Sequence, residues 1–261
     1  MLSLENITNG IHNWLYNTFN PTLALLIEFA IVAVCVISLF SLLGLVLIMM
    51  ERKVSAWMQV RLGPNRVGPK GMFQTVADTL KLIVKEGMTP DGADKFLFNL
   101  APFIVMIIAM MLMAPLMFAK GFQIWDINIG VLFFTSVSSV SVIGILMAGW
   151  ASNNKYSLLG AMRSGAQIVS YELSAGLSIL CIIVLTGSLS ISDIIAAQEN
   201  GWWIFKGHIP VIIAFVTFII AVTAETNRAP FDMAEAESEL TAGFHTEYSG
   251  MKFALFFLAE Y

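Results

Sequence analysis

The sequence predicts an all-α protein, a polytopic bundle of transmembrane helices, and three features carry that prediction. Hydrophobic residues make up 57% of the chain and charged residues only 12%, whereas an ordinary soluble domain has about a quarter charged residues. Several apolar runs are long enough to cross a bilayer, and the basic residues gather in alternate connections between them. A soluble protein of this composition would expose large apolar patches, whereas a bilayer accepts them.

The apolar runs define the predicted spans. A helix needs about 20 apolar residues to cross roughly 30 Å of hydrocarbon. Five full spans are predicted at 21–50, 96–118, 129–150, 165–189 and 208–224, followed by an incomplete sixth at 251–261. The first exceeds the required length, so it should tilt or protrude. We expect one integral membrane domain, 1–261, that ends within a helix, as a fragment or as an incomplete gene product.

The distribution of Lys and Arg predicts the orientation. All of these residues except Lys120 and Lys206 lie in the loops 51–95, 151–164 and 225–250 or at the start of the sixth span. The positive-inside rule places these loops in the cytoplasm and the N-terminus on the outer side. The N-terminus has neither a basic region nor a signal cleavage site, so no signal peptide is expected.

The first cytoplasmic loop contains two distinct features. Its residues 71–86 have one apolar face and one polar face, which predicts an amphipathic surface helix; a helix packed under a partner subunit has the same pattern, and the two are compatible. Before it, the segment from Arg61 to Pro69 combines Gly and Pro with Arg61 and Arg66. Gly and Pro fix an irregular backbone, and arginine pairs with carboxylates or polar headgroups. Either a partner protein or anionic lipid fits this loop.

Ionisable groups at membrane depth are costly and usually mark function. Glu28 lies early in the first span, where a position at headgroup level is the simpler interpretation. Glu172 lies within the fourth span, in Ser170-Tyr171-Glu172, too deep for a short side chain to reach water easily. We therefore interpret Glu172 as a functional carboxylate.

An acidic segment follows the fifth span. It contains one basic residue, Arg228, and five carboxylates: Glu225, Asp232, Glu235, Glu237 and Glu239. Crowded like charges influence one another's protonation, so such a set can take up and release protons in sequence. A charge run is usually a solvated loop, but the residues between these acids are largely apolar. We therefore favour a loop folded back into a cavity.

The cysteines give no indication of a metal centre. Cys35 and Cys181 lie alone in separate apolar runs, with no CxxC motif and no Cys/His cluster. The sequence therefore offers no ligands for an iron–sulfur centre or zinc.

Four stretches in order resemble the quinone-site membrane subunit, known as the H-type subunit, of the respiratory complex I family. They are Glu51-Arg52-Lys53 with Arg61-x-Gly-Pro-Asn-Arg-Val-Gly-Pro69; Ala77-Asp78 through Lys85-Glu86; Gly149-Trp150-Ala151-Ser152-Asn153-Asn154-Lys155-Tyr156 running to Gln167 and Ser170-Tyr171-Glu172; and Glu225-Thr226-Asn227-Arg228 through His245-Thr246-Glu247-Tyr248-Ser249-Gly250-Met251. Together they cover the chain from about residue 22 to its end. Members of the family usually have about eight spans, and this sequence stops at the start of the sixth.

The resemblance implies a proton-translocating NADH:quinone oxidoreductase in a bacterial inner membrane. In that family the corresponding membrane protein forms much of the tunnel for a long-tailed quinone and joins the peripheral arm to the membrane arm. The resemblance implies that FMN and the iron–sulfur clusters lie on partner subunits and that this chain binds no cofactor. Its partners would be the peripheral-arm iron–sulfur and quinone-site subunits and the neighbouring small membrane subunits.

The resemblance also implies roles for individual residues. Glu51, Arg61 and Arg66 would lie at or near the quinone tunnel, with Arg228 and Asp232 in its surroundings. Five carboxylates match those that lead protons away from the quinone chamber: Glu172, Glu225, Glu235, Glu237 and Glu239.

Two other functions fit parts of the sequence. A related energy-conserving hydrogenase or dehydrogenase would use a similar subunit with a different electron donor. A proton-coupled secondary transporter would also use carboxylates, but it predicts inverted repeats and broken helices, which this sequence does not show.

Overall fold

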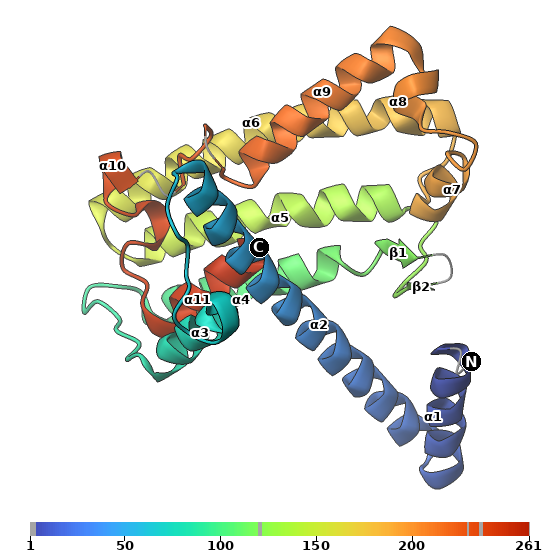
Figure 1. The fold of residues 1–261 in the computed structure, drawn as a ribbon, viewed down its shortest axis with the longest axis horizontal. Helices are drawn as coiled ribbons and strands as arrows, with labels where there is room; N and C mark the ends of the chain where they lie inside the picture. Colours follow the sequence, from blue (N-terminus) through green and yellow to red (C-terminus); the bar gives the residue numbers. More distant parts are fainter. Residues whose placement is uncertain (1–3, 120–121, 229, 235–236, 261) are drawn as a thin grey trace. The chain divides into compact units, whose positions relative to one another are not determined.

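The computed structural model describes residues 4–119, 122–228, 230–234 and 237–260. The chain divides into two compact units, Met1–Asp78 and Thr79–Tyr261. Figure 1 shows the helices of both units and the two short strands of the second.

The first unit begins with two helices, α1 (Leu4–Thr18) and α2 (Pro21–Met58). Pro21 is the first residue of α2, a position where the missing N–H of proline costs nothing. Leu15 and Ala24 are buried, and the Nδ1 of His12 lies 3.2 Å from both carboxylate oxygens of Glu28. Glu28 therefore has a partner on α1, a helix that was not predicted.

The loop after α2 folds back onto the end of that helix. It contains the short helix η1 (Pro69–Gly71) and leads into α3 (Gln74–Val84), the amphipathic helix expected within 71–86. Gly71 has φ +78°, and a Cβ there would lie 2.2 Å from the carbonyl oxygen of Pro64, so only glycine fits. Arg52 pairs with Asp78, and the Nζ of Lys53 donates to the carbonyl of Lys70 at 2.7 Å.

The second unit is a bundle of long helices that lie side by side (Figure 1). They are α4 (Lys95–Leu112), α5 (Gly130–Ala151), α6 (Lys155–Thr186), α9 (His208–Glu225) and the shorter α11 (Gly250–Glu260). One end of the bundle carries β1 (Met117–Ala119), β2 (Phe122–Gln123), α7 (Ile191–Ala196) and α8 (Trp203–Lys206). The other carries α10 (Glu237–Leu240) and η2 (Gly243–His245).

The fold class predicted from the sequence is confirmed. Among the described residues, five helices are long and apolar enough to cross a membrane: α2, α4, α5, α6 and α9. Hydropathy predicted the apolar part of each helix better than its ends. The helix α2 continues past the apolar run to Met58, and α6 already begins at Lys155, because helical hydrogen bonds continue through polar residues outside the hydrocarbon. The helix α4 stops at Leu112, shortly before Pro115, which cannot donate a helical hydrogen bond.

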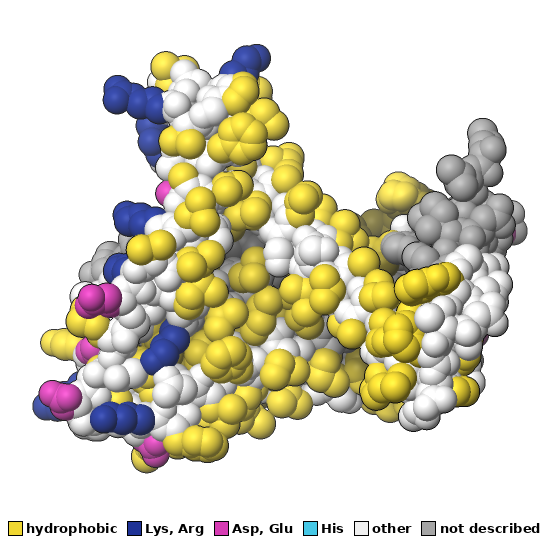
Figure 2. Space-filling view, turned by 90° about the horizontal axis from the view of Figure 1, so that it is seen from below, with side chains coloured by type: hydrophobic (Ala, Val, Ile, Leu, Met, Phe, Trp, Pro, Cys, Tyr) yellow, Lys and Arg dark blue, Asp and Glu magenta, His cyan; other side chains and the backbone are white. Residues whose placement is uncertain are grey.

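Small residues allow α5 and α6 to approach closely. A Cβ on Gly149 would lie 2.2 Å from the Cβ of Ala161 and 2.8 Å from the carbonyl oxygen of Ser157. Such close backbone contact is the usual way in which membrane helices associate, because lipid supplies no hydrophobic force between them. Larger apolar side chains face outward instead and cover most of the face seen in Figure 2.

Aromatic residues hold the segment before α11 against the bundle. The rings of Phe98 and Tyr248 stack with centroids 4.1 Å apart, and the hydroxyl of Tyr248 donates to the carbonyl of Phe98 at 3.1 Å. The hydroxyl of Ser157 donates to the carbonyl of Phe244 at 2.7 Å. These contacts fix the point at which α11 enters the bundle.

We predict that Gly149→Ala destabilises the protein by about 1–3 kcal/mol, because the added methyl group forces α5 and α6 apart. The thermal unfolding midpoint of the purified protein measures this effect. Gly176→Ala is the matched control, since nothing lies within 4 Å of a Cβ at Gly176. Equal midpoints for the two variants would contradict the close packing at Gly149.

Candidate functional site

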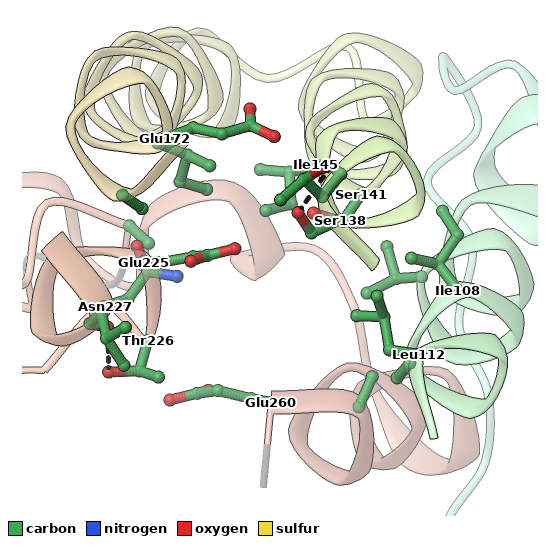
Figure 3. Close-up of a pocket in the computed structure, with 18 of the residues that line it drawn as sticks. Ile108, Leu112, Ser138, Ser141, Ile145, Glu172, Glu225, Thr226, Asn227 and Glu260 are labelled. Atoms are coloured by element: carbon green, nitrogen blue, oxygen red, sulfur yellow. Dashed lines mark hydrogen bonds between the residues drawn. The ribbon is translucent and has the colours of Figure 1, made fainter. Parts of the chain in front are cut away.

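The second unit encloses a cavity of about 450 Å³ between α4, α5, α6, α9 and α11. Most of its lining is apolar, and its polar side chains come from several helices and from the segment that follows α9: Thr135, Ser138, Ser141, Glu172, Glu225, Thr226, Asn227, His245 and Glu260. Figure 3 shows Glu225 and Glu260 extending toward the same hollow from different helices. The cavity therefore brings three carboxylates together within an apolar bundle.

Glu172 lies on α6 and turns toward α5. Its Oε1 accepts a hydrogen bond from the hydroxyl of Ser139, so the carboxylate has a donor from the neighbouring helix. An acidic side chain away from water is tolerated when such a donor satisfies it.

Glu225 is the last residue of α9, and Gln167 of α6 fixes the end of that helix. The side-chain amide of Gln167 donates to the carbonyl of Ala224 and to the carbonyl of Phe231, both at 2.8 Å. Asn227 then turns the backbone with φ +50°. Gln167 thus holds both the end of α9 and the start of the acidic segment against the helix that carries Glu172.

Glu260 reaches the cavity from α11. Its Oε1 lies 3.3 Å from the Nη2 of Arg228, which follows α9, so this ion pair ties the acidic segment to α11. Glu260 was not among the residues predicted from the sequence. The signal was nevertheless there, because an acidic residue within the apolar segment 251–261 is itself a mark of function.

His245 also lines the cavity and was not predicted. It is buried among aromatic rings, with Phe244, Phe253 and Phe257 at centroid distances of 4.9–6.1 Å. Burial lowers the pKa of His245 to about 4, because the charged imidazolium loses its hydration there. The ring is therefore neutral at physiological pH.

Of the other predicted acids in the segment after α9, Asp232 and Glu239 do not line this cavity. Asp232 is exposed, and Glu239 pairs with Arg163 of α6, with a distance of 2.7 Å between Oε2 and Nη1. Glu235 lies outside the described residues, as does the side chain of Glu237. For the predicted folding of this segment back into the protein, the structure shows Glu225 in the cavity, the ion pair of Arg228 with Glu260 and the hydrogen bonds of Gln167.

The predicted tunnel residues Glu51, Arg61 and Arg66 belong to the first unit. Glu51 lies in the last turns of α2, and Arg61 follows that helix and donates through Nε to the side-chain oxygen of Gln59 at 2.5 Å. Arg66 is exposed on the Gly/Pro-rich loop. The loop thus presents arginines on a backbone that Gly71 and Lys53 hold in place.

We find no candidate metal site among the residues that the structure describes. There, no group of three His, Cys, Asp or Glu side chains is placed to hold an ion, and Cys35 and Cys181 are free thiols.

Comparison with known proteins identifies the family. A sequence model of the family described as NADH dehydrogenase matches residues 29–261. The chain belongs to this family. Over its whole length it is 54% identical to the H subunit of the NADH-quinone oxidoreductase of Bacteroides thetaiotaomicron and covers 73% of that protein. It is 47% identical over 256 residues to the protein of the same name from Carboxydothermus hydrogenoformans, of which it covers 72%.

Family membership confirms the resemblance to the H-type subunit of complex I. The cavity with Glu172, Glu225 and Glu260 lies within the part of the chain that the NADH dehydrogenase family model covers. The helix α1 and Glu28 lie before it. The carboxylates of the cavity, rather than the pair of His12 and Glu28, are therefore the first candidates for a function shared across the family.

The buried His245 predicts a loss of stability in acid. The unfolded chain takes up a proton at this residue below about pH 6.5, whereas the folded protein does so only near pH 4. Stability is therefore unaffected above pH 6.5 and is lost as the pH falls through this window, by up to about 3 kcal/mol. The unfolding midpoint of the complex between pH 8 and pH 5 should depend less on pH in His245→Gln than in the wild type.

The exposed His208 provides the control. His208→Gln should keep the wild-type dependence on pH. An identical dependence in His245→Gln and the wild type would show that His245 is not a buried neutral group.

Proposed function

We propose that this chain is the membrane subunit of an NADH:quinone oxidoreductase that forms the quinone-binding tunnel and couples quinone reduction to proton translocation. The observation that carries the proposal is the meeting of Glu172, Glu225 and Glu260 in one cavity of a bundle of apolar helices. Carboxylates in such a place are costly and are retained where protons or charges move. The names of the similar proteins supply the reaction.

The carboxylates form the proposed proton relay. Glu225 stands at the end of α9, where the acidic segment begins, and Glu172 and Glu260 extend the set to α6 and α11. Glu235, Glu237 and Glu239 would connect it with the quinone. Moving one elementary charge against 100 mV costs about 2.3 kcal/mol, so the relay needs groups whose affinity for protons changes with the charge of the quinone.

The quinone-binding residues would be Glu51, Arg61 and Arg66, and Arg228 and Asp232 would belong to the surroundings of the tunnel. Arginine donates several hydrogen bonds in a fixed geometry and is always charged, which suits an oxygen that becomes negative on reduction. The exposed position of Arg66 on a rigid loop supports this assignment.

The remaining assignments follow from the same function. The chain is a multi-pass protein of the bacterial inner membrane and forms one integral membrane domain, with its N-terminus on the periplasmic side and the loops 51–95, 151–164 and 225–250 in the cytoplasm. Its partners are the peripheral-arm subunits that carry FMN and the iron–sulfur clusters, and the small membrane subunits. The chain itself contributes the quinone site and the relay.

The relay predicts that Glu172→Gln lowers proton pumping in membrane vesicles at least about tenfold, the usual size of a lost acid–base group, and lowers NADH:quinone reductase activity with it. The quenching of a pH-sensitive dye and the oxidation of NADH measure the two rates. Glu199→Gln, at an exposed acid outside the cavity, is the control and should behave as the wild type. Wild-type rates of both processes in Glu172→Gln would remove Glu172 from the relay.

The tunnel assignment predicts that Arg66→Ala raises the KM for a soluble quinone about tenfold, because one charge-assisted hydrogen bond is lost. Arg66→Lys keeps the charge but not the planar donor group, so an intermediate KM is expected. Lys206→Ala removes a basic residue outside the predicted cytoplasmic loops and should leave the KM unchanged. Unchanged affinity for quinone in Arg66→Ala would exclude Arg66 from the tunnel.

A further inference from the structure

The hydroxyl of Ser139 lies between two acceptors. It is within hydrogen-bond distance of the Oε1 of Glu172 on the neighbouring helix and lies 2.9 Å from the carbonyl oxygen of Thr135, one turn earlier on its own helix α5. A serine hydroxyl has a single hydrogen and two lone pairs. It can therefore donate to only one of these acceptors at a time.

The carbonyl of Thr135 does not depend on Ser139 alone. The hydroxyl of Ser138 also donates to it at 2.9 Å. When Ser139 turns its hydrogen toward Glu172, the carbonyl of Thr135 therefore keeps a side-chain donor. Turning the hydroxyl of Ser139, an exposed side chain, thus leaves this carbonyl with a donor.

We propose that Ser139 is a positioning residue for Glu172 whose hydrogen bond reverses direction when Glu172 gains or loses a proton. With Glu172 charged, Ser139 donates to its Oε1. With Glu172 protonated, the carboxyl O–H donates to the oxygen of Ser139, whose own hydrogen turns to the carbonyl of Thr135. The protonated state has one hydrogen bond more than the charged state, and the only proton gained or lost is that of Glu172. This inference rests on the proposed role of Glu172 in the relay.

The reversal allows Glu172 to change charge within an apolar bundle. A hydrogen bond to a charged group is about twice as strong as one between neutral groups, so Ser139 stabilises the carboxylate. The neutral acid still finds an acceptor in the same place, so neither state leaves a polar group without a partner. Glu172 also stays against α5 in both states, and the relay geometry does not change with protonation.

The test compares Ser139→Ala with Ser139→Thr in membrane vesicles. Loss of the hydroxyl should lower proton pumping about tenfold, because the charged form of Glu172 loses a donor. Ser139→Thr keeps a hydroxyl and should restore pumping. Ser178→Ala is the matched control, since that hydroxyl donates only to the carbonyl of Ala175 on its own helix, among the described contacts.

A double variant separates this inference from the function on which it rests. If Ser139 acts through Glu172, Ser139→Ala should have no further effect in a Glu172→Gln background. A full additional loss in the double variant would overturn the inference, as would wild-type pumping in Ser139→Ala or equal impairment of Ser139→Ala and Ser139→Thr. Wild-type pumping in Glu172→Gln would overturn the proposed role of Glu172 on which the inference rests.

Discussion

The structure depends on one constraint, the cost of placing charge where water is absent. Three carboxylates enter one cavity of an apolar bundle, and polar neighbours are found at two of them: Glu172 accepts from Ser139, and Glu260 pairs with Arg228. Glu225 stands where α9 ends and the polar backbone begins. Removing a partner from such a group costs far more than the pair contributes when intact. The helices that carry Glu172 and Glu260 must therefore stay close to the residues that supply their partners, Ser139 and Arg228.

Close helix packing makes this arrangement possible. The serine side chain is short, so Ser139 reaches Glu172 only because α5 and α6 lie side by side. Gly149 and Ala161 pack closely between the same two helices, and Gln167 holds the end of α9 on α6. Because closely packed helices form its walls, the cavity keeps the distances between its polar groups when their charges change. A proton relay requires such fixed distances.

The sequence predicted the helices well because length and hydropathy act along the chain, and membrane spans obey them closely. The candidates Glu172 and Glu225 follow from the same reasoning, since acids in or beside apolar runs are rare, and both line the cavity. The sequence did not predict α1, whose several asparagines have low helix propensity, and it missed Glu260 and His245. Nor could it predict that Ser139 reaches Glu172 or that Glu239 pairs with Arg163, because contacts between helices depend on their rotation and register, which no local pattern records.

The central claim is that the carboxylates of the cavity change protonation when quinone is reduced. Infrared difference spectroscopy of the intact complex, recorded on reduction with NADH, measures this most directly, since a protonated carboxyl absorbs apart from a carboxylate. The account predicts carboxyl bands that change on reduction and that diminish specifically in Glu225→Gln, with the exposed Glu199→Gln as control. A difference spectrum without carboxyl bands, or one that is the same in Glu225→Gln and the wild type, would contradict it.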